Sequence, residues 1–204
     1  MTTPTKLIFL PGAGGSAGFW EPVSELLLHP ASRTLLGWPG FGPEPVDRLV
    51  TSVDDLVNMV VSELDQPSAL IAQSMGGAIA LQAALRRLDR VTHLVLAVTS
   101  GGIDISGLGA EDWRPAFQKS NPSVPRWFID YKLDLSSSLG LIRAPTLLLW
   151  GDADPISPVA VGERLGTLLP HARMHVFAGG QHDLANTLAH DVASQIDAHL
   201  SDAD

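Results

Sequence analysis

The chain is predicted to fold as one α/β domain, with a mostly parallel sheet of six strands and helices on both faces. Short apolar runs alternate along its 204 residues with longer segments whose apolar residues recur at helical spacing, and this alternation is typical of a parallel sheet. The apolar runs do not alternate with polar residues, as expected of strands that are covered on both faces. The length corresponds to one domain, at about 150 residues per domain.

Six short apolar runs, most of them bounded by glycine, proline or polar residues, are the predicted strands. They cover residues 6–10, 33–37, 69–73, 91–98, 147–150 and 174–177. The predicted helices have helical apolar spacing and cover residues 20–29, 52–64, 75–88, 158–169 and about 183–200. Ser52 is predicted to cap the second of these helices, with two aspartates in its first turn. Ser157 and Pro158 are predicted as the N-cap and first residue of the fourth.

One segment, from about residue 101 to 132, interrupts the alternation of strands and helices. A stretch this long between elements is usually a functional lid or disordered, and its large aromatic side chains argue against disorder. These side chains are Trp113, Phe117, Trp127, Phe128 and Tyr131. The prediction is therefore a single domain over residues 1–204, with a short cap at about 101–132.

Composition excludes several classes of function. The 13 Lys and Arg against 22 Asp and Glu give a net charge of −9. This balance argues against a nucleic-acid-binding protein, because such domains carry a basic patch. The cluster of Arg86, Arg87 and Arg90 falls at a predicted helix end, where cations complement the helix dipole. The chain has no cysteine and therefore no disulfide, thiolate metal ligand or cysteine nucleophile. Without a signal-peptide pattern or a long apolar run, we expect a cytoplasmic protein with no membrane partner.

The residues between the third predicted strand and its helix are typical of a nucleophile. Ser74 lies on a sharp strand-to-helix turn, and the small residues Ala72 and Gly76 stand two positions before and after it. This spacing matches the G-x-S-x-G nucleophile elbow, in which larger neighbours would collide as the chain doubles back. The alternative is that Ser74 only caps the following helix.

A serine nucleophile needs a base and a group that orients the base. His182 follows the sixth predicted strand, and Asp152 and Asp154 follow the fifth. Because all these loops leave the carboxyl edge of a parallel sheet, we expect them to converge with Ser74, in the chain order Ser, Asp, His. Asp154 precedes Pro155, which favours an extended backbone at Asp154 and so fixes the direction in which its side chain leaves the chain. Asp152 is instead expected to bond its own backbone in the turn. Asp154 is therefore the predicted orienting acid.

A glycine-rich turn over residues 11–16 follows the first predicted strand. It matches neither the dinucleotide fingerprint nor a phosphate loop, so no cofactor is expected. The main-chain N–H groups of Ala13 and Met75 are the expected donors to an oxyanion. The alternative is an ordinary strand-to-helix turn.

Taken together, these motifs resemble the α/β-hydrolase fold. The resemblance covers the glycine-rich turn, the Pro-Gly-Phe-Gly turn at 39–42, the elbow at 72–77, the acid loop and the histidine loop. It implies that the chain begins at the third of the family's eight strands, giving a minimal sheet in the order 2-1-3-4-5-6 with a short cap after the fourth strand. The sequence departs from the family pattern at Pro11, where His is usual, at Gln73, where His is frequent, and at Ala72, where Gly is usual.

The motifs predict a serine hydrolase that cleaves the carboxylic ester of a small or medium acyl substrate. Ser74 is the expected nucleophile, His182 the general base and Asp154 the orienting acid, and the reaction requires neither metal nor cofactor. Thioesterase, acyl-transfer or lyase chemistry on the same residues is an alternative, as is a non-catalytic binding protein. Four cap residues are expected to include the apolar walls of the substrate pocket: Trp113, Phe117, Trp127 and Phe128.

Overall fold

A computed structural model of the chain describes residues 2–201, and within them a single six-stranded sheet has the order β2-β1-β3-β4-β5-β6. All neighbouring strands are parallel, so the predicted fold class and strand order are confirmed. The strands are β1 (Lys6–Leu10), β2 (Ser32–Leu35), β3 (Ser68–Gln73), β4 (Val91–Ala97), β5 (Thr146–Gly151) and β6 (Ala172–Phe177).

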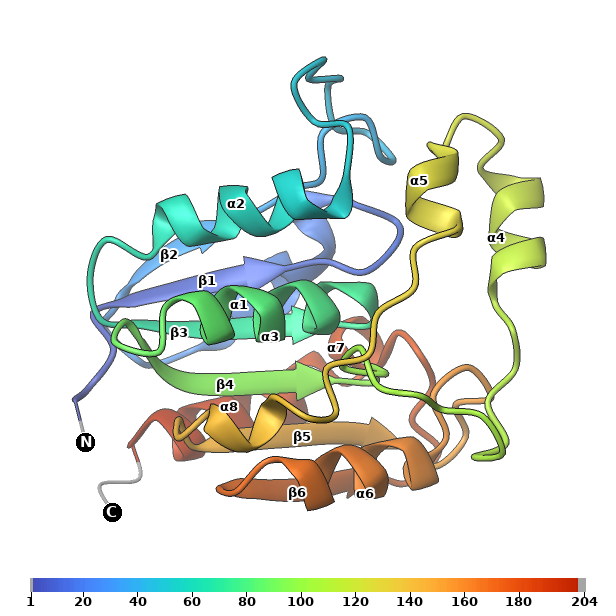
Figure 1. Cartoon of the computed structure of the whole chain (residues 1–204). Coiled ribbons are helices and arrows are strands. Elements are labelled where there is room, and N and C mark those ends of the chain that lie inside the picture. The colour runs from blue at the N-terminus through green and yellow to red at the C-terminus, as the bar shows by residue number, and fades with distance from the viewer. Residues whose placement is uncertain (1, 202–204) are drawn as a thin grey trace.

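Helices cover both faces of this sheet (Figure 1). On one face lie α2 (Val53–Glu63), α3 (Met75–Arg86) and α6 (Val159–Leu168), and on the other α1 (Glu21–Leu26) and α8 (Ala189–Ser201). Two short helices, α4 (Arg114–Ser120) and α5 (Arg126–Ile129), lie beyond the carboxyl ends of the strands within the predicted cap. The remaining elements are η1 (Ala17–Trp20), η2 (Leu139–Leu141) and α7 (Leu184–Thr187).

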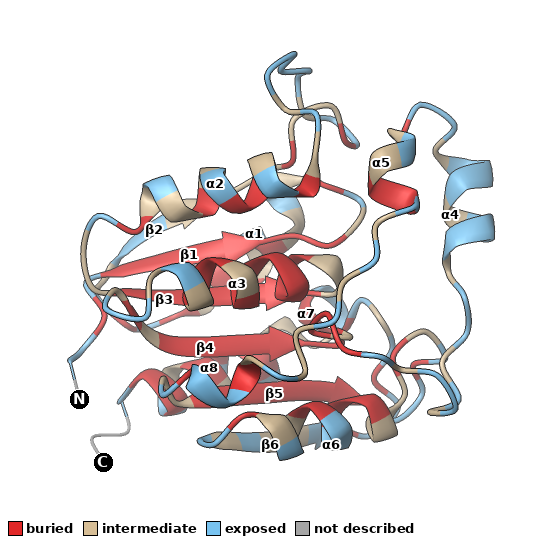
Figure 2. Ribbon diagram, in the orientation of Figure 1, coloured by how far each residue is buried: buried red, intermediate tan, exposed pale blue. Residues whose placement is uncertain are grey.

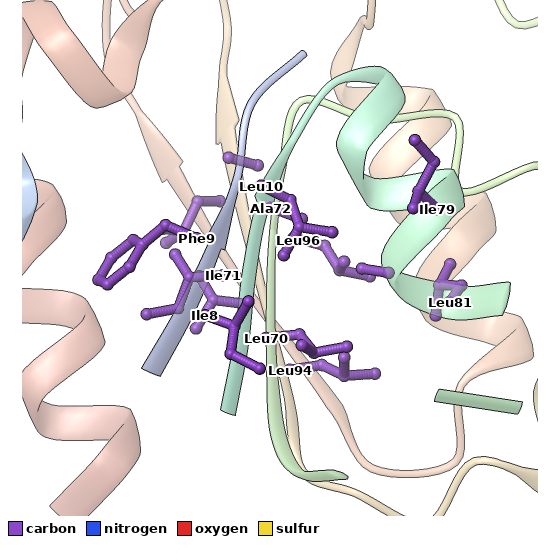
Figure 3. Packing of buried hydrophobic residues seen from close by; sticks show 14 of the residues in the cluster. Ile8, Phe9, Leu10, Leu70, Ile71, Ala72, Ile79, Leu81, Leu94 and Leu96 are labelled. Atoms are coloured by element: carbon purple, nitrogen blue, oxygen red, sulfur yellow. The ribbon is translucent and has the colours of Figure 1, made fainter. Parts of the chain in front are cut away.

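The central strands form the core, because both of their faces are covered. Every residue of β1, β3 and β5 is buried, and Figure 2 shows the buried residues concentrated in these strands and in the helix faces against them. Ile71 on β3 lies among side chains of β1, and Leu94 on β4 lies near Leu70 of β3 (Figure 3). No helix within residues 2–201 combines the length and the apolar composition needed to cross a bilayer.

Three predicted helix limits are wrong. The first helix is shorter than 20–29, because residues 17–20 form a 3-10 turn and the backbone is already extended at Leu27. The last predicted helix is broken at Leu188, whose non-helical backbone separates α7 from α8. Ser157 caps nothing: Pro158, with extended ψ, is the N-cap, and α6 begins at Val159.

The arginine cluster connects helices rather than only ending one. Arg86 forms an ion pair with Asp54 of α2, and its Nη1 donates to Oδ1 of Asn58 at 2.7 Å. Arg87 pairs with Asp89 at 3.1 Å. The guanidinium of Arg86 therefore links α3 to α2 on one face of the sheet.

Ser52 caps α2 as predicted. Its Oγ accepts from the N–H of Asp55 at 3.2 Å, and the Asp55 carboxylate accepts from the N–H of Thr51 and from the Ser52 hydroxyl. These hydrogen bonds hold the pKa of Asp55 below its usual value. Ser52 thus satisfies one of the unpaired N–H groups at the start of α2, and Asp55 binds back to the residues before the helix.

Replacing Ser52 with Ala should lower the free energy of unfolding by about 1 kcal/mol, because the first turn of α2 loses its cap. For a domain of this size the melting temperature should fall by about 2–4 °C. Ser62→Ala is the matched control on the same helix, since the exposed Ser62 hydroxyl bonds only the carbonyl of Met59. Equal effects of the two substitutions in thermal unfolding would contradict the capping role.

Candidate active site

Ser74 stands on a strained turn between β3 and α3. Its backbone has φ 52° and ψ −123°, a region that non-glycine residues rarely adopt. The turn brings α3 so close to β1 that a Cβ at Gly76 would collide with the carbonyl oxygen of Pro11 and lie 2.8 Å from that of Leu10. The Ser74 hydroxyl makes no capping bond to α3. The side chain is therefore left available at the carboxyl edge of the sheet, contrary to a simple capping role.

The structure brings His182 and Asp154 to Ser74 in one hydrogen-bonded chain. Nδ1 of His182 lies 2.7 Å from Oδ2 of Asp154, and Nε2 lies 2.9 Å from Oγ of Ser74. A carboxylate only accepts, so Nδ1 carries the proton and Nε2 accepts from the serine hydroxyl. The Asp154 side chain is fully buried, and its Oδ1 accepts from the N–H of Ile156 at 2.8 Å. This chain can draw the proton from Ser74.

The sequence predicted that Asp152 would bond its own backbone, and this prediction is wrong. Its Oδ1 accepts from the N–H of Gly179 at 2.6 Å, and the N–H of Ala153 donates to the carbonyl of Gly180 at 3.0 Å. The two aspartates of the acid loop therefore have different partners. Asp152 binds the main chain of the histidine loop, and Asp154 binds the imidazole.

The glycine-rich turn after β1 is held beside Ser74 by Trp38. The buried indole Nε1 of Trp38 donates to the carbonyls of Pro11 and Gly12, both at 3.1 Å. Within residues 2–201, neither the N–H of Ala13 nor that of Met75 has a hydrogen-bond acceptor. Met75 is also the first residue of α3, where the helix dipole favours negative charge. Both expected donors are thus unpaired next to the nucleophile.

Two cavities meet at Ser74 and His182. The first, of about 580 Å³, is lined by residues 11–16 and by Phe19, Trp113, Phe117 and Ile156 among others. The second, of about 680 Å³, includes Met75, Val98, Ser100, Phe128, Tyr131 and Ser157 in its walls. Both lie between the sheet edge and the cap. The arrangement has room for a substrate on either side of the serine.

The four predicted cap aromatics are not equivalent. Trp113 lines both cavities, Phe117 only the first and Phe128 only the second. Trp127 lines neither and packs edge-on against Phe41, with ring centroids 5.9 Å apart. Phe128 also packs on Phe41 at 4.7 Å. The rings therefore both line the cavities and fasten the cap to the body.

The mouth of the first cavity is acidic. Three exposed carboxylates, Glu111, Asp112 and Asp183, lie among its lining residues, and these residues include no lysine or arginine. Arg114, just outside, lies 3.2 Å from Asp112 and offsets part of this charge. The second cavity contains Arg114 and Lys132 as well as acidic residues. Among residues 2–201, no group of three or more His, Asp or Glu side chains is arranged to hold a metal ion.

Two residues of the site carried no role in the sequence analysis. Gln73 donates from Nε2 to the carbonyl of His182 at 2.9 Å, although the two are far apart in the chain. Trp38 supports the glycine-rich turn from the loop after β2. The signal for Gln73 was a polar residue at the end of a buried strand, next to the serine. Trp38 gave no comparable signal, because it lies in a loop away from the predicted nucleophile, base and acid.

Comparisons with known proteins agree with this architecture. A family model described as the Alpha/beta hydrolase family matches residues 7–135. A 2-hydroxy-6-oxononadienedioate/2-hydroxy-6-oxononatrienedioate hydrolase from Cupriavidus pinatubonensis is 29% identical, with 82% of this chain and 75% of the relative covered. A pimeloyl-(acyl-carrier protein) methyl ester esterase from Aliivibrio salmonicida is 22% identical, with 87% and 85% covered.

Solved structures share the fold at low sequence identity. A meta-cleavage product hydrolase from Pseudomonas fluorescens superposes with a TM-score of 0.80 at 20% identity, covering 100% of this chain and 93% of that one. A thermophilic esterase from Thermogutta terrifontis gives a TM-score of 0.78 at 19% identity, covering 96% and 89%.

The different partners of the two aspartates predict different effects on the reactivity of Ser74. Asp154→Asn should slow covalent labelling of Ser74 by a fluorophosphonate by on the order of 10⁴-fold, because an amide favours the wrong histidine tautomer. Asp152→Asn keeps an Oδ1 acceptor for Gly179 and should slow labelling far less. Rates from intact-protein mass spectrometry decide the matter, and the reverse ranking would make Asp152 the orienting acid.

Proposed function

The chain belongs to the alpha/beta hydrolase family, and on this premise we propose that it is a serine hydrolase that cleaves carboxylic esters of small or medium acyl groups. The observation that carries the proposal is the hydrogen-bonded chain from Asp154 through His182 to Ser74 at the junction of two cavities. The esterase names of a sequence relative and of a solved structure with this fold support the ester as the substrate class.

In the proposed reaction, Oγ of Ser74 attacks the ester carbonyl carbon while Nε2 of His182 takes the hydroxyl proton. The buried carboxylate of Asp154 holds the imidazole through Nδ1–H and stabilises the imidazolium that forms. The carbonyl oxygen becomes an oxyanion, and the unpaired N–H groups of Ala13 and Met75 are its proposed donors.

The first tetrahedral intermediate then collapses. The bond from carbon to the alkoxy oxygen breaks, and His182 returns its proton to that oxygen, so an alcohol leaves and an acyl-Ser74 ester remains. Water, deprotonated by His182, attacks the acyl carbon and forms a second tetrahedral intermediate. Its collapse breaks the bond from carbon to Oγ, His182 returns the proton to Oγ, and a carboxylic acid leaves.

Substituting Ser74 with Ala should reduce hydrolysis of p-nitrophenyl butyrate by about 10⁴-fold or more, because the acyl-enzyme no longer forms. The melting curve should stay close to that of the wild type, since Ala fits the same turn. Ser62→Ala, on the exposed side of α2, serves as the control with normal activity. Unchanged hydrolysis by a natively folded Ser74→Ala variant would rule out the proposal.

The cap aromatics should divide according to their contacts. Phe117→Ala enlarges the first cavity and should shift the ratio of kcat/KM between octanoyl and butyryl p-nitrophenyl esters toward the longer chain, by roughly tenfold. Trp127→Ala removes a ring that packs on Phe41 outside both cavities. It should lower stability by about 1 to 3 kcal/mol and leave the ratio unchanged.

The same shift in both cap variants would mean that movement of the cap as a whole, and not the wall at Phe117, sets the chain-length preference. Thermal unfolding of each variant, recorded beside the kinetics, separates loss of stability from a change in selectivity.

A further inference from the structure

The side chain of Gln73 joins the nucleophile turn to the histidine loop. Gln73 is the last residue of β3 and directly precedes Ser74, and it is 5% exposed. Its Nε2 donates to the main-chain carbonyl of His182 at 2.9 Å. This hydrogen bond is part-buried, and breaking it costs free energy because the carbonyl and the amide then lose their partners. Gln73 therefore restrains the main chain at His182.

The N–H and carbonyl of His182 itself have few other partners. Its neighbours Gln181 and Asp183 are exposed. Within residues 2–201, the carbonyl of His182 accepts from Gln73 alone, and the N–H of His182 makes no hydrogen bond. The carbonyls of these neighbours are bonded to the start of α7: Gln181 accepts from the N–H of Leu184 at 3.1 Å, and Asp183 accepts from the N–H of Asn186 at 2.7 Å. These bonds fix the loop on the side of α7, whereas Gln73 holds the His182 carbonyl from the side of the nucleophile turn and Asp154 holds the imidazole ring.

The glycine-rich turn packs closely on the side chain of Gln73. A Cβ at Gly12 would collide with Oε1 of Gln73 and lie 3.0 Å from Cβ of Ser74. The amide therefore occupies the space that a side chain at position 12 would take, between the glycine-rich turn and the histidine loop. Because the side chain leaves the end of a buried strand, little conformational freedom remains to it.

We propose that Gln73 is a positioning residue, which keeps Nε2 of His182 within hydrogen-bonding distance of Ser74 by fixing the His182 carbonyl. This inference rests on the proposed serine hydrolase function and adds a fourth side chain to its machinery. A misplacement of about 1 Å in a catalytic group can cost about 10²-fold in rate. The loss belongs to the chemical step and not to substrate binding, because Gln73 acts through the histidine.

The first test replaces Gln73 with Met, which keeps the length of the side chain and removes its N–H donor. With p-nitrophenyl butyrate we expect kcat to fall by about 10²-fold, while KM stays near the wild-type value. The melting temperature should fall slightly, because the His182 carbonyl loses its donor. Fluorophosphonate labelling of Ser74 should slow by a similar factor. Gln181→Met is the matched control, since this neighbour of His182 is exposed and lines neither cavity; it should leave kcat unchanged.

Gln73→Glu gives a second variant of nearly identical shape that places an acceptor in front of the His182 carbonyl. It should lose activity as Gln73→Met does, and it decides the question if the Met variant does not fold. A Glu variant with wild-type kcat would overturn the proposal. So would a Met variant in which only KM rises, because that result assigns Gln73 to direct substrate contact.

A double-mutant cycle with His182→Ala shows which group Gln73 acts through. If it acts through the histidine, adding Gln73→Met to the His182→Ala enzyme should reduce the residual rate no further. An equal loss in both backgrounds would instead assign its effect to the glycine-rich turn and overturn the proposal. Failure of the proposed function is distinguishable, since a wild-type protein that neither hydrolyses esters nor labels at Ser74 would refute that function before any Gln73 variant is made.

Discussion

The strained backbone at Ser74 is the constraint on which the rest of the site depends. A non-glycine residue with such dihedral angles costs on the order of 1–3 kcal/mol and persists only where its surroundings over-determine it. Here the N–H of Ser74 donates to the carbonyl of Ala97 at 2.9 Å, and Gly76 packs directly on the main chain of β1. The same close approach brings the start of α3 beside the glycine-rich turn. The strained turn at Ser74 thereby brings the nucleophile close to the unpaired N–H groups of Ala13 and Met75.

The strands could be predicted because their signals are local and strong. Each central strand is a continuous apolar run whose two faces are both buried. The strand order came instead from the resemblance to the α/β-hydrolase fold. Helix ends were harder to predict. The apolar spacing continues through Leu188, yet α7 ends there. The sequence does not reveal such a break, because the packing that favours it comes from elsewhere in the chain. The convergence of Ser74, Asp154 and His182 could be predicted because a parallel sheet places the loops that carry them at one edge.

Two hydrogen-bonding side chains of the site could not be paired from the sequence, because their partners are main-chain atoms of distant segments. Asp152 bonds the amide of Gly179, and Trp38 bonds the carbonyls of Pro11 and Gly12. Neither partner has a side-chain signature, so residue type alone could not reveal the pairing. The cap shows the same limit. Trp127 and Phe128 are adjacent in sequence, but Phe41, in the loop after β2, contacts both rings and leaves only Phe128 at a cavity.

The acidic residues that line the first cavity would disfavour binding of the product of the proposed reaction. An uncharged ester enters past Glu111, Asp112 and Asp183 without electrostatic hindrance, but hydrolysis releases an acid that ionises at neutral pH. The product anion then lies in a negative potential, on a chain whose net charge is −9, and that potential falls away toward solvent. Expulsion of the carboxylate is favoured over its retention, so accumulated product should compete poorly with fresh substrate, most clearly at low ionic strength, where the repulsion is least screened.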